Sequence, residues 1–140
     1  MISDASRTEP QAWLKAPLVQ AFEAGTIDPV TFRHRQHLYV AWCYLHSMPL
    51  EGAVARYVHH LRQLTAALGA PQKFHATMTW AYLVLLHEAI QKRPHATFDE
   101  LMTTHPELLD HAAGALYAHY DREQLSSPEA RQRFVLPRRA

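Results

Sequence analysis

Apolar residues recur at helical spacing along most of the chain. The clearest stretch is 50–68, where an apolar stripe repeats every three or four residues and the other faces are polar. Comparable patterns predict helices over 11–24, 28–47 and 73–92, and the last is apolar nearly all round, which is typical of a central helix. A capping box at 97–100 predicts a short helix to about residue 104, and further short helical segments are expected over 107–111 and 112–119, with a final turn capped at 127–129. No alternating pattern long enough for a useful strand is present.

Proline and glycine separate these segments, as in a helical protein: Pro17 is expected to break or restart the first helix, and Gly25 and Gly69 to end helices. A chain of 140 residues fits one domain, 1–140. The prediction is therefore all-α: a single compact helical bundle of about four main helices, with short C-terminal helices packed across it. We expect residues 1–10 to form a loose N-terminus and residues 134–140 to form an extended basic tail.

Charge, apolar runs and cysteine content argue against nucleic-acid binding, a membrane span and an internal disulfide. The net charge of +1 is too small to predict nucleic-acid binding, and no apolar run reaches the length of a membrane span. The single cysteine, Cys43, excludes an internal disulfide, and its apolar neighbours favour a buried, inert thiol. With no apolar signal-peptide segment at the start, these features predict a cytoplasmic protein. The sequence does not give the oligomeric state.

Histidine carries the candidate chemistry, with 11 residues in the chain. His34 and His37 are three apart, so on a helix they share one face. His75 leads the apolar stretch 73–92, and Thr79 and Tyr82 follow it at helical spacing, as in the wall of a polar pocket. The alternatives are that His34 and His37 are surface residues, and that His75 is a hydrogen-bonded core histidine or an N-terminal cap.

A second zone rich in histidine and aromatic residues lies between His105 and Tyr120. It has no regular metal-ligand spacing. Its side chains could line the mouth of a pocket, which we weigh as a weaker candidate site.

Two sequence blocks carry a resemblance. The first is an FxHxxHLxxAW block from Phe32 to Trp42, and the second is an FHxTxTxA block from Phe74 to Ala81. Together with the later stretches 106–110 and 130–137, they resemble a group of short, uncharacterised bacterial all-helical proteins built on the same series of blocks. The resemblance implies no particular reaction, but it supports His34, His37 and His75 as the residues to test.

The leading hypothesis is a small-molecule enzyme with a three-histidine site. His34, His37 and His75 would hold a divalent transition metal, zinc, iron or copper, with one position open to water or substrate. Thr79 and Tyr82 would shape the substrate pocket. One alternative is a metal-free lyase, isomerase or hydrolase in which the same histidines act as acid and base. Another is a non-catalytic helical module that binds a ligand or a protein partner.

Overall fold

All regular structure in residues 10–110 and 114–138, which the computed structural model describes, is helical. The all-α prediction is confirmed. The chain divides into two compact units, Met1–Pro71 (unit 1) and Gln72–Ala140 (unit 2). The single domain expected from the length stays a prediction. Most of the predicted loose N-terminus lies outside the described residues.

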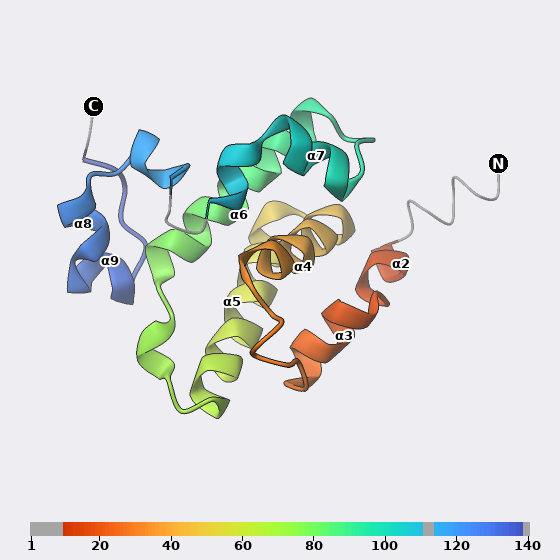
Figure 1. Cartoon of the computed structure of the whole chain (residues 1–140), viewed down its shortest axis with the longest axis horizontal. Coiled ribbons are helices and arrows are strands. Elements are labelled where there is room, and N and C mark those ends of the chain that lie inside the picture. The colour runs from red at the N-terminus through yellow and green to blue at the C-terminus, as the bar shows by residue number, and fades with distance from the viewer. Residues whose placement is uncertain (1–9, 111–113, 139–140) are drawn as a thin grey trace. The chain divides into compact units, whose positions relative to one another are not determined.

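Unit 1 is built around one helix, α4, which contacts the three other helices of the unit (Figure 1). Pro17 begins the second helix after a short break, as the sequence predicts, and Gly25 closes it with a φ of 72° that favours glycine. The helices are α2 (Pro10–Leu14), α3 (Pro17–Ala24), α4 (His34–Ser47) and α5 (Leu50–Ala67).

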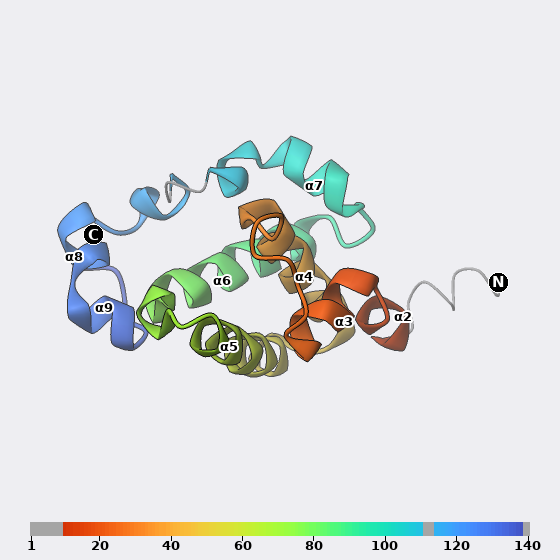
Figure 2. The same cartoon turned by 60° about the horizontal axis from the view of Figure 1, so that its bottom comes forward.

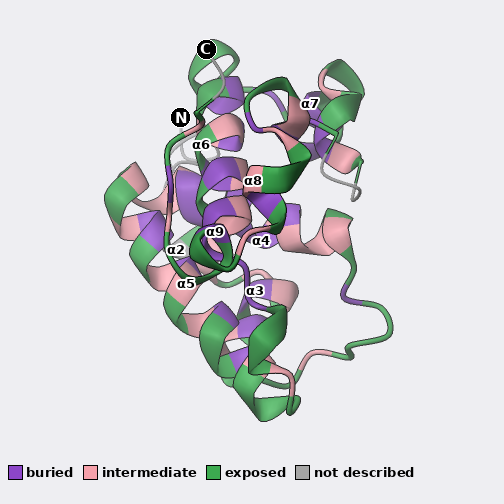
Figure 3. Cartoon of the chain, turned by 90° about the vertical axis from the view of Figure 1, so that its left-hand side faces the viewer, coloured by how far each residue is buried: buried purple, intermediate pink, exposed green. Residues whose placement is uncertain are grey.

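The middle of α4 is buried on every side, because all six residues from Val40 to Leu45 are buried (Figure 3). Phe22 of α3 lies against Tyr44 of α4 and Tyr57 of α5, with ring centroids 6.4 and 5.3 Å away. Cys43 is fully buried, and burial raises the pKa of its thiol to about 11. The thiol is therefore protonated at neutral pH and is a core group.

Unit 2 is organised along its longest helix, α6. Figures 1 and 2 show α8 and α9 beside the first turns of α6, and α9 and the short helix η3 contact it. The predicted capping box begins α7, where the Thr97 hydroxyl accepts the Glu100 N–H at 3.1 Å. After η1 (Pro71–Lys73), which begins at the last residue of unit 1, the elements are α6 (Ala76–Lys92), α7 (Phe98–Thr104), η2 (Pro106–Leu109), η3 (Leu116–Ala118), α8 (Arg122–Ser126) and α9 (Pro128–Gln132).

The expectation that α6 is buried all round is wrong. Trp80 and Val84, one turn apart, are 38% and 36% exposed. Within unit 2 the small helices η3 and α9 pack on α6 and leave this strip open, although Trp80 does lie against Phe134, with ring centroids 5.5 Å apart. Within the described residues, no helix is both long and apolar enough to cross a membrane.

The C-terminal segment beyond α9 has no regular secondary structure over the residues described to position 138, and the extended basic tail stays a prediction. Its backbone is held at several points. The Tyr120 hydroxyl donates to the Val135 carbonyl at 2.7 Å, and the Gln124 side chain donates to the Leu136 carbonyl at 2.9 Å. The Arg138 guanidinium pairs with Asp121 at 3.1 Å. The segment is therefore an integral part of unit 2.

Candidate functional site

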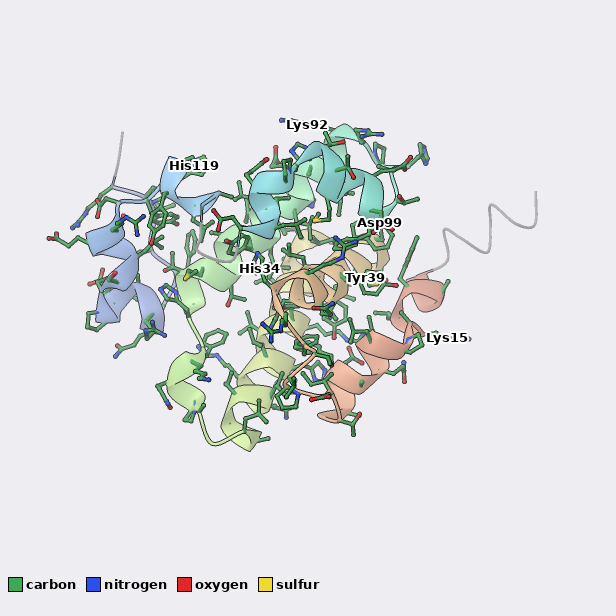
Figure 4. The ribbon with its side chains drawn as sticks, viewed as in Figure 1. Lys15, His34, Tyr39, Lys92, Asp99 and His119 are labelled. Carbon is green, nitrogen blue, oxygen red and sulfur yellow. The ribbon has the colours of Figure 1, made fainter. Side chains whose placement is uncertain are left out.

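His34 and His37 lie one turn apart at the start of α4, in unit 1 (His34 is labelled in Figure 4). The Arg33 N–H donates to the Gln36 side chain at 3.0 Å and helps to fix this first turn. The Phe32 ring packs against the His37 ring, with centroids 4.3 Å apart. The predicted neighbourhood of the two histidines therefore exists, at the edge of the aromatic core.

His37 is a neutral imidazole at physiological pH. Burial, with a smaller contribution from the charge of His34, lowers its pKa to about 4. Its Nδ1 lies 3.1 Å from the hydroxyl of Tyr57, which also lies 3.4 Å from the His37 carbonyl oxygen. No described residue forms a hydrogen bond with Nε2. That nitrogen is the group of His37 that remains for a ligand or for water.

His75 lies in unit 2 and is the N-terminal cap of α6. Its Nδ1 accepts the Met78 N–H at 3.1 Å, and its Nε2–H donates to the Leu125 carbonyl at 2.8 Å. These two bonds require one neutral tautomer, and burial keeps the pKa of His75 below its ordinary value. A metal ion could bind only by replacing one of the two bonds. The structure thus places His75 in the cap role that the sequence left open.

Thr79 and Tyr82, the predicted pocket residues, also satisfy backbone groups of unit 2. The Thr79 hydroxyl donates to the His75 carbonyl at 2.7 Å, and the Tyr82 hydroxyl donates to the Asp110 carbonyl at 3.2 Å. Burial raises the pKa of Tyr82 to about 12. Neither side chain lines the cavity described below.

The fully buried threonine of this stretch is Thr77, which the sequence did not single out. Its hydroxyl donates to the Arg133 carbonyl at 2.9 Å and accepts the Val135 N–H at 3.1 Å. The FHxTxTxA block therefore contacts the C-terminal block 130–137. Part of what made the block distinctive in sequence has a structural explanation.

Unit 1 also contains a charged cluster that the sequence did not predict. Glu23 accepts two hydrogen bonds from Arg56, at 2.6 and 2.9 Å, and one from the Tyr44 hydroxyl. Burial alone would raise the pKa of Glu23, but the bonds from Arg56 and Tyr44 hold it below its ordinary value. These partners are 21 and 33 residues away in sequence. The helical pattern placed Arg56 on a polar face and gave no signal for a paired carboxylate.

Unit 2 contains a cavity of about 360 Å³ between α6 and the segments that follow α7. His105 and His119, from the second histidine-rich zone, both line it, as the weaker sequence interpretation anticipated. The Nδ1 of His105 lies 3.3 Å from a carboxylate oxygen of Glu107. The remaining lining residues are Leu85, Glu88, Ala89, Lys92, Leu108, Gly114, Ala115 and Ala118.

Within residues 10–110 and 114–138, no group of three or more His, Cys, Asp or Glu side chains is arranged to hold a metal ion. The metal site predicted at His34, His37 and His75 stays a prediction.

No family model, curated protein or solved structure matches the chain significantly. The resemblance drawn from the two blocks also stays a prediction, and functional inference depends on the site chemistry alone.

Proposed function

We propose that the protein binds a small organic molecule in the cavity of unit 2. The observation that carries the proposal is a cavity of about 360 Å³ whose wall combines apolar side chains with carboxylates, an ammonium and two imidazoles. Ligand sites in proteins typically occupy about 300–1,000 Å³ and combine an apolar lining with a few polar groups. This is the ligand-binding hypothesis among those that the sequence left open.

The apolar part of the wall is well anchored. Leu108 and Ala115 are 3% and 8% exposed, and Leu85 packs against the buried cluster that contains Leu116 and Tyr120. Such packed side chains keep their positions when a ligand enters, which limits the binding energy lost to reorganisation of the apolar wall.

The polar groups favour acid–base chemistry as a second candidate function. In the His105–Glu107 pair, a carboxylate can fix the orientation and tautomer of the imidazole and leave Nε2 to accept a proton. This is the metal-free enzyme hypothesis, moved from His34, His37 and His75 to the histidines of the cavity. It requires a bound ligand first, so ligand binding is the property to test.

The metal-dependent enzyme has less support, because both ring nitrogens of His75 already form hydrogen bonds. Elemental analysis of protein purified without a histidine tag tests it. Stoichiometric zinc, iron or copper that is lost in His37→Ala and retained in His59→Ala would favour the metal site over the proposal made here. His59 is exposed and serves as the matched control.

Ligand binding can be tested by titrating the protein with n-butylamine, butanoate and 1-butanol while recording the histidine ring signals by NMR. At least one compound should shift His105 and His119 saturably and leave His59 unchanged. Ala118→Leu should abolish the effect, because it fills space at the cavity wall, whereas Ala66→Leu at an exposed site of α5 should not. Absence of any shift at His105 and His119 would reject the proposal.

A further inference from the structure

The charges around the cavity are unbalanced. Glu88 and Glu107 supply two carboxylates and Lys92 supplies one ammonium, so the formal charge of the lining is −1 while the histidines are neutral. Within the described residues, the side chains of Glu88 and Lys92 form no hydrogen bond or ion pair, and the Glu107 carboxylate pairs only with His105, at 3.3 Å. Two carboxylates are thus available to a ligand at the cavity, and the excess charge favours a cation.

The positions of the charges also favour a cationic ligand. Leu85, Glu88, Ala89 and Lys92 have the spacing of one face of α6, so apolar and charged positions alternate along one wall. Glu107 comes from η2. A ligand whose hydrocarbon part lies on Leu85 and Ala89 would therefore have carboxylates from two different elements within its surroundings.

We infer that the ligand of this cavity is a small aliphatic amine, with its ammonium group directed to Glu88 and Glu107 and its hydrocarbon part on the apolar wall. The inference depends on the proposed function and specifies its ligand class. An anionic ligand would have only Lys92 as a permanent positive charge and would face two carboxylates. Like charges placed against one another disfavour binding.

The test ranks the affinities of the three four-carbon probes at pH 8. n-Butylamine should bind about fivefold more tightly than 1-butanol, since two partly exposed ion pairs together contribute roughly a factor of two to thirty. Butanoate should bind least. Because exposed ion pairs are screened by salt, the advantage of the amine should shrink between low and high ionic strength.

Matched variants identify the recognising groups. Glu88→Gln combined with Glu107→Gln should reduce the affinity for n-butylamine to that for 1-butanol, while Glu51→Gln at an exposed position of α5 should leave it unchanged. Unaltered amine binding in the double variant would overturn the inference. So would tighter binding of butanoate or 1-butanol than of the amine, although ligand binding itself would then stand. Failure of all three probes to shift His105 and His119 would overturn both.

Discussion

His37 in unit 1 and His75 in unit 2 are both neutral imidazoles at the start of a helix, yet hydrogen bonding leaves them with different freedom. In His75 both ring nitrogens bond to backbone groups, at 3.1 and 2.8 Å. In His37 only Nδ1 bonds to a described residue, the Tyr57 hydroxyl. The pair shows that position at a helix start does not distinguish a structural histidine from one that can react. The distinguishing feature is the number of ring nitrogens that form no hydrogen bond with a described residue.

The largest expected effect is that of His75→Ala, at about 3–4 kcal/mol of the free energy of unfolding. The change removes an N-terminal cap, which contributes about 0.5–2 kcal/mol, and leaves the Leu125 carbonyl unsatisfied, which costs about 1–3 kcal/mol. His75→Asn should recover the cap and lose only the second bond. Denaturant melts measure both. If His75→Ala lowered the free energy of unfolding by less than His37→Ala, His75 would not be the more structural of the two histidines.

The second effect is pH dependence through His37. Its pKa is about 4 in the folded chain, against about 6.5 when unfolded, so the unfolded chain takes up the proton first as the pH falls. The stability contributed by the neutral ring is complete above about pH 6.5 and is lost between pH 6.5 and 4, by up to about 3 kcal/mol. Melts across this range should show the loss, and His37→Gln should show much less. If wild type and His37→Gln lost stability in parallel between pH 6.5 and 4, the loss could not be assigned to His37.

A third comparison is between two threonines two residues apart. Thr77→Val should cost about 1–2 kcal/mol, because it removes both hydrogen bonds to the C-terminal segment and leaves buried backbone groups without partners. Thr79→Val should cost less than about 0.5 kcal/mol, because its hydroxyl only bonds back to a carbonyl of its own helix. Thermal or denaturant unfolding measures the difference, and equal losses would argue against the holding role of Thr77.

The smallest effect is expected at an exposed histidine. His59→Ala should change the free energy of unfolding by less than about 0.5 kcal/mol, since His59 lies on the outer face of α5. Its value is as a baseline for the histidine series. A larger loss in the same melts would show that histidine replacement alone, without loss of a specific bond, accounts for part of the effect at His75.

Local signals predicted most of the helices, although the helix expected over 28–47 begins only at His34. Pro17, Gly25 and Gly69 mark element boundaries where the sequence placed them, and the Thr97 capping box begins α7. These features act over a few residues, so a single sequence contains all the information needed. The short helix α8 was missed because five residues give no periodicity, and its cap, Asp121, is recognisable only once the helix is known.

The candidate site was harder to predict, because its meaning depends on distant partners. The position of His75 was visible in the sequence, but its bond to the Leu125 carbonyl spans 50 residues. The same applies to Glu23 and Arg56, 33 residues apart. By contrast, His105 and His119 were noticed as a group of similar residues. That density, rather than any spacing rule, is the signal that pointed to the cavity wall.

The hydrogen bonds from His75 and Thr77 to the C-terminal region also determine when unit 2 can form during synthesis. The first turn of α6 needs the Leu125 carbonyl, and Thr77 needs backbone groups 56 and 58 residues further along the chain. A ribosome has therefore made nearly all of unit 2 before the start of α6 can be completed. Until then the apolar side of α6 is uncovered in the nascent chain, where contacts of long sequence separation form slowly. For this reason we expect unit 2 to be prone to aggregation while it is being made.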